Sequence, residues 1–274
     1  MSETYPIDET VVRMQEIIYG ILCEIDDVCR KNNIRYYLSG GTCLGAVRHH
    51  GFIPWDDDGD VMMPRQDYER FVSLFNGSCS QDYRLCALSL DPAWNLPYAR
   101  VWFTHSRIIH QTIYDPDIGV YVDIFPIDGI PASDLGRKRF FLHVQFLNEM
   151  CTEAKRKHYN TKTKLIRRCA KPVAGLFGAR YFANRMNEYV RRFDFETSAD
   201  VACSLPAHYG DREIIPRECM SSQAWMPFRG REFAVPAGYD RYLRNLYGER
   251  YMEVPKPSEI VNHQRQWEVV FGDE

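Results

Sequence analysis

The sequence predicts an α/β (α+β) fold, a mixed sheet core with flanking helices and a basic helical insertion. Three observations lead to this prediction. Apolar residues recur at helical spacing over 8–33, short β-branched and aromatic runs follow, and residues 136–200 return to a helical pattern rich in Lys and Arg. The 274 residues are 45% apolar and 26% charged, which is typical of a globular protein with one large domain or a core with an appended lobe.

We expect three parts along the chain. Residues 1–135 would form the core, residues 136–200 a basic helical arm, and residues 201–274 a C-terminal region that packs back on the core. No internal repeat and no low-complexity tract interrupts this order.

The first elements are a helix over 8–33, with Asp8 or Thr10 as its N-cap, and a short strand over 35–38. A short helix ending at Gly51 follows a glycine pair, and then comes a strand in "DGDVMM". Helical spacing returns over 65–77, where Gly77 is the expected stop.

Four runs of β-branched and aromatic residues predict further strands: "YRLCAL", "YARVWFT", "SRIIHQTIY" and "VYVDIFPID". The helical arm is expected to break at 171–178, within "KPVAGLFG". Short mixed segments then lead to an amphipathic helix over 238–248.

The ends and the cysteines predict a cytoplasmic protein. The N-terminus "MSETYPIDETVV" has neither the basic nor the apolar region of a signal peptide, and no run approaches 18 apolar residues. The nine cysteines are scattered and form no C-x-x-C pair, so we expect reduced thiols rather than zinc or a disulfide framework. A net charge of −3 argues against a general nucleic-acid binder.

Four aspartates in five residues stand out in "IPWDDDGDV", residues 53–61. On a strand Asp58 and Asp60 would point to one face, where a divalent cation would relieve their repulsion. Oxygen ligands suit Mg²⁺ or Mn²⁺, and Asp123, an acid within an apolar strand, is the candidate third ligand. The alternative is a simple acidic turn. An EF-hand loop is excluded because no Glu stands at its twelfth position.

The glycine pair Gly40 and Gly41, directly after a predicted strand, would let the backbone approach a phosphate group. Thr42 would add a hydroxyl and Arg48 a bidentate grip on phosphate oxygens. The alternative is an ordinary strand-to-helix turn. Neither G-x-G-x-x-G nor a Walker motif is present, which disfavours Rossmann cofactors and P-loop hydrolysis.

A glycine pair, an apolar-flanked D-x-D and a later strand acid together resemble the nucleotidyltransferase superfamily, and within it the LicD family with its fukutin-related members. The resemblance rests on residues 36–71, 120–131 and 231–252. It implies a nucleotidyltransferase-like core that transfers a phospho-group from a cytidine nucleotide to a sugar of a cell-surface glycan or its lipid-linked precursor. It also implies that Asp58 and Asp60 bind metal, that Asp123 is the third acid, and that Gly40, Gly41 and Thr42 line the donor phosphates.

The sequence departs from the family pattern at several positions. Gly59 replaces the usual apolar residue inside D-x-D, which would loosen the strand and shift the metal geometry. Arg100 and Trp102 stand where relatives often carry Lys and Arg, so Arg100 becomes the candidate phosphate contact. The closing His-His of the family is reduced to His263.

Other residues near the motif have more than one interpretation. Asp123 would help to deprotonate the attacking hydroxyl or would only bind metal. Asp56 is expected to support the ligands, while His49 and His50 would face solvent or bind phosphate. Trp55 is a candidate for contact with cytosine, although packing in the core is favoured.

The arm carries 15 Lys and Arg against three acids between 137 and 192, and its cations flank an apolar tip at 172–178. This pattern predicts an interfacial hairpin that docks on the inner, anionic membrane leaflet or on a lipid-pyrophosphate-linked glycan. A solvated helix face is the alternative, and RNA is a weaker one because no aromatic-rich motif accompanies the charge.

Three functions remain open from the sequence. The first is transfer of phosphocholine, phosphoethanolamine, aminoethylphosphonate or a polyol phosphate, with release of CMP. The second is transfer of a nucleotide monophosphate, with release of pyrophosphate. The third is an inactive scaffold that binds glycan or membrane.

Overall fold

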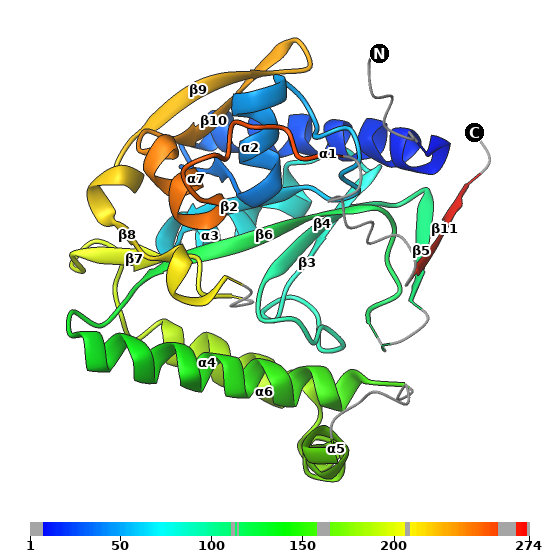
Figure 1. Ribbon diagram of the computed structural model, residues 1–274. Coiled ribbons are helices and arrows are strands. Elements are labelled where there is room, and N and C mark those ends of the chain that lie inside the picture. Colours follow the sequence, from blue (N-terminus) through cyan, green and yellow to red (C-terminus); the bar gives the residue numbers. More distant parts are fainter. Residues whose placement is uncertain are drawn as a thin grey trace.

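A mixed sheet lies at the centre of the computed structural model, which describes residues 8–110, 113, 115–157, 165–205, 209–256 and 267–272 (Figure 1). Its strands follow in the order β1 (Tyr37–Leu38), β2 (Asp60–Pro64), β6 (Tyr121–Gly129), β4 (Ala99–Phe103) and β3 (Tyr83–Cys86). β2 runs parallel to β6, and the other neighbours are antiparallel. The predicted α/β class with flanking helices is therefore confirmed.

Two smaller pairings extend the sheet and close the chain. The far end of β6 pairs with β7 (Asp200–Ala202), which in turn pairs with β8 (Ile215–Pro216). Strand β5 (Ser106–His110) pairs with β11 (Trp267–Phe271), although these strands are far apart in the sequence. The rest of the predicted "SRIIHQTIY" strand lies largely outside the described residues.

Helix α1 (Glu9–Asn32) covers one face of the sheet, as its apolar spacing predicts. Its N-cap is Asp8, whose carboxylate accepts from the Thr10 amide, and Ile18, Ile21 and Ile25 are completely buried. The N-terminal elements that follow are α2 (Gly40–His49), α3 (Arg65–Leu74) and the 3-10 turn η1 (Phe75–Gly77). The helix expected over 65–77 is thus confirmed up to its last turn.

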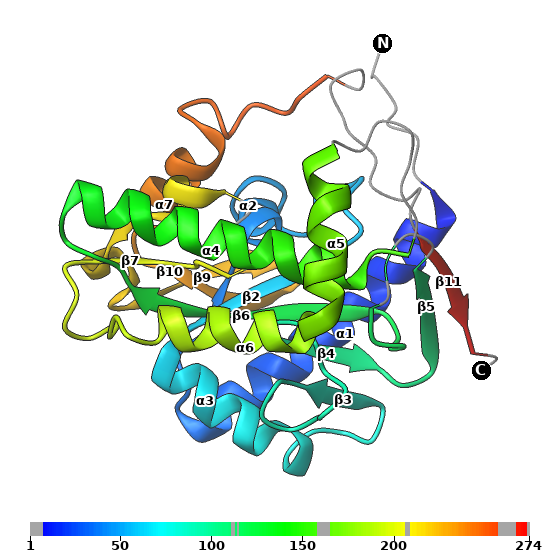
Figure 2. The same ribbon diagram turned by 90° about the horizontal axis from the view of Figure 1, so that it is seen from below.

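The arm folds as α4 (Asp134–Lys155), α5 (Leu165–Phe177) and α6 (Ala179–Val190). Seen from below, α4 and α6 lie side by side in front of the sheet and α1 lies behind it, while α5 crosses their outer side (Figure 2). The break expected within 171–178 occurs at the last residue of this span. Helix α5 continues through Pro172 and ends only at Gly178, where φ is +80°.

The C-terminal region contains the 3-10 turns η2 (Gly210–Glu213) and η3 (Arg217–Met220), the hairpin β9 (Gln223–Phe228) and β10 (Arg231–Pro236), and helix α7 (Tyr239–Tyr247). Helix α7 matches the predicted segment 238–248, whereas the hairpin was not predicted. Arg231, in the hairpin, donates to the carboxylate of Asp26, a fully buried acid of α1. The same carboxylate accepts from the Tyr36 hydroxyl at 2.5 Å. This buried network fixes the hairpin on α1. The division into three parts stays a prediction.

No helix in the described part of the chain is both long and apolar enough to cross a bilayer.

Candidate functional site

The acid cluster consists of Asp56, Asp58, Asp60 and Asp123. Asp60 is the first residue of β2, and the parallel register of β2 and β6 places it opposite Asp123. The preceding loop adds Asp56 and Asp58. Asp56, Asp57 and Asp58 each offer one carboxylate oxygen, and these three oxygens lie within 4.8 Å of one another. The structure therefore brings the three predicted acids to one end of two central strands, with Asp56 beside them.

Gly59 separates the acids because its backbone is pressed against α1. A Cβ at this position would lie 2.5 Å from Ile18 Cγ2 and 3.2 Å from Val122 Cγ2. The Gly59 carbonyl accepts from the Asp123 amide at 2.9 Å, which ties the loop to β6. The glycine that departs from the family pattern thus allows close packing of the strand against α1.

Crowding of negative charge is the main electrostatic feature of the cluster. Burial, and then the neighbouring carboxylate of Asp58, raise the pKa of Asp56 well above its usual range. Burial and the carboxylates of Asp58 and Asp123 do the same to the pKa of Asp60, and Arg100 only partly opposes them. In this arrangement either protons or a cation must offset the charge.

Arg100 lies on β4, directly opposite Asp123 in the antiparallel register. Its Nε donates to Asp123 Oδ1 at 2.6 Å, its Nη1 lies 3.6 Å from Asp115 Oδ2, and its guanidinium stacks 3.8 Å above the Tyr121 ring. The side chain is only 6% exposed. Arg100 therefore holds the third acid in place, while a direct contact with substrate phosphate stays a prediction.

The glycine pair forms the start of α2 and faces the cluster. Gly40 has φ of +48°, and a Cβ there would lie 3.4 Å from Asp60 Oδ2. A Cβ on Gly41 would lie only 2.8 Å from Asp56 Oδ2. Thr42 is buried, and its hydroxyl accepts from the Asp60 amide at 2.9 Å. These contacts position the acids, and the predicted role of the three residues in phosphate binding stays open.

The remaining predicted residues surround the far end of α2. Arg48 donates to the carbonyl oxygens of Tyr251 and Glu253 and to His49 Nε2, so it ties α2 to the segment after α7. Trp55 is partly buried against the core and meets the His49 ring edge-on, with 6.5 Å between centroids. His50 is the C-cap of α2, in the left-handed region. His263 lies outside the described residues.

Three tyrosines that the sequence analysis did not single out also reach the cluster. The Tyr242 hydroxyl accepts from the Gly40 amide at 3.2 Å and lies 3.1 Å from Ser39 Oγ. The Tyr247 hydroxyl lies close to Gly40 and 3.4 Å from the Tyr209 hydroxyl. Burial raises the pKa of Tyr209, and the carboxylates of Asp60, Glu213 and Asp58 add to this rise. In the sequence, the spacing of the aromatic residues over 238–248 indicates a helix but gives no sign that Tyr242 and Tyr247 contact the glycine pair.

Comparison with known proteins identifies relatives of this chain. Residues 33–130 match the family described as LicD/FKTN/FKRP, nucleotidyltransferase domain. The lipopolysaccharide cholinephosphotransferase LicD of Haemophilus influenzae is 25% identical over 264 residues, 94% of this chain and 97% of the relative. The ribitol 5-phosphate transferase FKRP of Homo sapiens is 26% identical over 101 residues, 37% of this chain and 19% of the relative. An uncharacterized protein of Rickettsia typhi is 37% identical over 68 residues, 25% of this chain and 22% of the relative. The matched residues include every member of the acid cluster.

Proposed function

We propose that this chain transfers a phospho-group from a cytidine nucleotide to a sugar hydroxyl of a glycan, because residues 33–130 match the LicD/FKTN/FKRP nucleotidyltransferase domain. The glycan would be a cell-surface polymer or its lipid-linked precursor. The phospho-group would be phosphocholine, phosphoethanolamine, aminoethylphosphonate or a polyol phosphate. The observation that carries the proposal is the acid cluster, in which Asp60 lies opposite Asp123 on two central strands and Asp56 and Asp60 lie against the first turn of α2.

A divalent cation fits these residues. Burial and like charge raise the pKa values of Asp56 and Asp60, so a cation would be favoured over the repelling carboxylates alone. The donors are carboxylate oxygens, which suit Mg²⁺ or Mn²⁺. Asp58 and Asp60 would hold the cation together with Asp56 or Asp123, and Arg100 donates to Asp123 Oδ1 from the other side. When bound, the cation would supply positive charge for the donor phosphates.

The protein's own groups would orient the reactants. Gly40 and Gly41 lie against the carboxylates of Asp60 and Asp56, and the first-turn amides of α2 from Gly41 onward, which lack intrahelical acceptors, would donate to a phosphate. In the reaction, the sugar oxygen forms a bond to the phosphorus and the bond from that phosphorus to CMP breaks. CMP leaves with the electron pair, and the hydroxyl proton passes to a carboxylate such as Asp123 and then to water.

CMP release tests this proposal. Protein with Mg²⁺ or Mn²⁺ would be given a panel of cytidine-linked donors, with membrane extract as the acceptor source. We expect one donor to yield CMP, and Asp58→Asn to abolish its release. Asp82→Asn, a change at an exposed surface acid, should leave release intact. A parallel reaction with CTP tests the alternative: release of pyrophosphate from CTP would support a nucleotidyltransferase. Release of neither CMP nor pyrophosphate would support a scaffold. Equal CMP release by Asp58→Asn would refute the role of the cluster.

We also propose peripheral contact of α5 with the anionic inner face of a membrane. Val173, Leu176 and Phe177 are 52%, 81% and 52% exposed on a helix at the outer side of the molecule (Figures 1 and 2). Several arm cations are engaged within the protein, for example Arg137 by Asp200, Lys155 by Asp115, and Arg180 by the carbonyl oxygens of Leu88, Asp91 and Trp94. The apolar residues therefore supply most of the support for this contact.

Co-sedimentation with vesicles tests the contact. We expect binding to vesicles that contain phosphatidylglycerol, and weaker binding after Leu176→Asp. The matched control is Leu90→Asp, since Leu90 is 46% exposed but lies outside the arm. Binding that ignores the anionic lipid content, or that falls equally in both variants, would contradict the proposal.

A further inference from the structure

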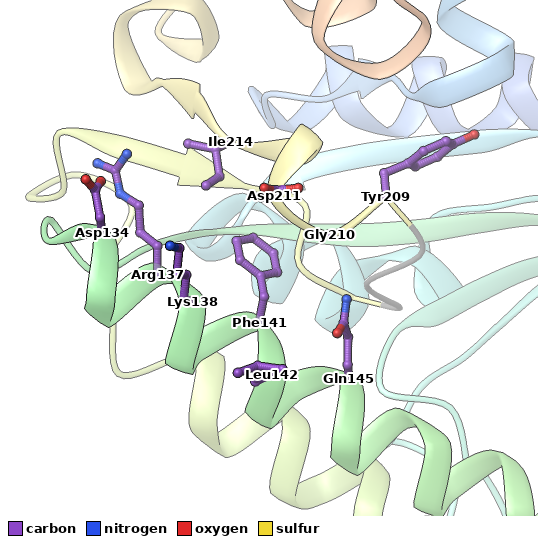
Figure 3. A pocket seen from close by; sticks show the side chains of 10 residues that line it. All are labelled: Asp134, Arg137, Lys138, Phe141, Leu142, Gln145, Tyr209, Gly210, Asp211 and Ile214. Atoms are coloured by element: carbon purple, nitrogen blue, oxygen red, sulfur yellow. The ribbon is translucent and has the colours of Figure 1, made fainter.

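A cavity of about 670 Å³ lies between α4 and the turn that begins η2 (Figure 3). Its volume is within the range of ligand pockets, roughly 300–1,000 Å³. One wall is α4, from which Phe141 and Gln145 point toward the opposite wall. The opposite wall contains Tyr209 and Gly210, whose φ of +60° bends the chain around the cavity.

Tyr209 connects this cavity with the acid cluster. Tyr209 belongs to the lining, its ring points away from α4 (Figure 3), and its hydroxyl lies 3.4 Å from the hydroxyl of Tyr247. Tyr247 in turn lies against Gly40, whose neighbour across the turn is the Asp60 carboxylate. Tyr209 and Tyr247 therefore lead from the edge of the cavity to Gly40 and the Asp60 carboxylate.

The charge of the lining favours a neutral ligand. Asp134 and Asp211 are matched by Arg137 and Lys138, so the formal charges cancel. Arg137 is further neutralised by Asp200 at 2.5 Å. A nucleotide donor carries several negative charges and would gain little here, which leaves the acid cluster and α2 as its site.

The polar and apolar groups of the lining suit a sugar. Within the described residues no hydrogen bond or ion pair engages the side chains of Lys138, Gln145 or Asp211, so these groups are available to hydroxyls. Phe141 and Leu142 provide an apolar surface for the C–H face of a sugar ring. Both kinds of group occur in the same cavity.

We infer that this cavity is the acceptor site and that it takes an uncharged sugar unit, one hydroxyl of which passes Tyr209 to reach the acid cluster. The inference rests on the proposed transferase function. It assigns the acceptor to the side of α4 and the donor to the side of α2. The reacting hydroxyl forms the new bond to phosphorus as CMP leaves.

Saturation-transfer NMR with methyl glycosides of glucose, galactose and N-acetylgalactosamine tests the site directly. We expect a signal from at least one glycoside with the native protein, and its loss in Gln145→Trp, which fills the cavity. Leu135→Trp is the matched control, because Leu135 is exposed on the same helix and does not line the cavity. Equal melting temperatures of the variants and the native protein would establish that both fold.

A second measurement separates this inference from the proposed function. The melting-temperature increase caused by CDP-choline with Mg²⁺ should be unchanged in Gln145→Trp, since the donor would bind elsewhere. No glycoside signal with the native protein, or an equal signal in Gln145→Trp, would overturn the acceptor site even if CMP is released. A glycoside signal that depends on Gln145, with no CMP release from any donor, would leave the cavity as a sugar site and reject the transferase.

Discussion

Gly59→Ala should destabilise the protein because no space exists for a methyl group between β2 and α1. The added Cβ would lie 2.5 Å from Ile18 Cγ2, whereas optimal carbon–carbon contacts are about 3.5–4.0 Å. Ile18 is completely buried, so it has little freedom to move away. Overpacking of this kind costs about 1–3 kcal/mol, against a gain of about 0.4–1 kcal/mol from the reduced entropy of the unfolded chain. We expect a net loss of about 1–2 kcal/mol.

Urea unfolding followed by circular dichroism measures this change, and the neighbour provides a rescue. Ile18→Ala removes the Cγ2 atom that the new methyl group would meet. As a single change it should lower the free energy of unfolding by about 2–5 kcal/mol, because it leaves a cavity. The double variant should be more stable, by about 0.5–3 kcal/mol, than the sum of the two single losses in free energy of unfolding predicts. The control is Gly77→Ala, where a Cβ meets nothing within 4 Å.

The same series tests the link between packing and the site, because Asp58 and Asp60 flank Gly59. The melting-temperature increase caused by a cytidine donor with Mg²⁺ should shrink in Gly59→Ala and recover in the double variant. If Gly59→Ala unfolds at the same urea concentration as the native protein, the packing argument is refuted. If the two changes are simply additive, Ile18 is not the obstacle.

Three further predictions follow from single contacts. Arg100→Met should lower the free energy of unfolding by about 3–5 kcal/mol, because it leaves the buried Asp123 and Asp115 without their shared cation. Arg100→Lys should recover part of this loss in the same urea assay. An unchanged urea midpoint in Arg100→Met would contradict the pairing. Thr42→Val should lower the free energy of unfolding by about 1–3 kcal/mol, because the Asp60 amide loses its acceptor. Thr42→Ser should keep this hydrogen bond. Equal urea midpoints for the two variants would contradict the role of the hydrogen bond. Burial raises the pKa of Glu213 to about 8 from its ordinary value of 4.5, so the folded state binds the proton more tightly than the unfolded state. Stability should therefore fall as pH rises from about 4.5 to 8, by at most about 1.4 kcal/mol per pH unit, and melting curves of Glu213→Gln should lack this slope.

The sequence predicts the local parts of the site well because each has a local signal. The helical spacing of 8–33 identifies α1, and the apolar run after Asp60 identifies β2. A glycine pair after a strand marks the start of α2 because few other residues adopt φ of +48°. These elements need only short-range patterns; β2 begins with Asp60, and the loop between α2 and β2 holds Asp56 and Asp58.

Contacts between distant segments could not be predicted in the same way. Sequence shows Arg100 as a cation on a strand, but only the register of β4 against β6 places it on Asp123. The count of basic residues in the arm likewise says nothing about their partners, and several of them turn inward to carboxylates and carbonyl oxygens. Charge composition therefore overstated the cationic surface of the arm.

The contact between Tyr242 and Gly40 changes how the glycine pair should be understood. The Gly40 amide already donates to the Tyr242 hydroxyl, which is completely buried and also lies on Ser39. A donor phosphate would therefore meet the next amides of α2, beginning at Gly41, while Gly40 serves through its left-handed backbone. Since Tyr242 belongs to α7, the Gly40 amide meets this acceptor only when the C-terminal region is folded against α2. The conformation of the proposed phosphate site thus depends on residues about 200 positions later in the chain, where no local motif announces them.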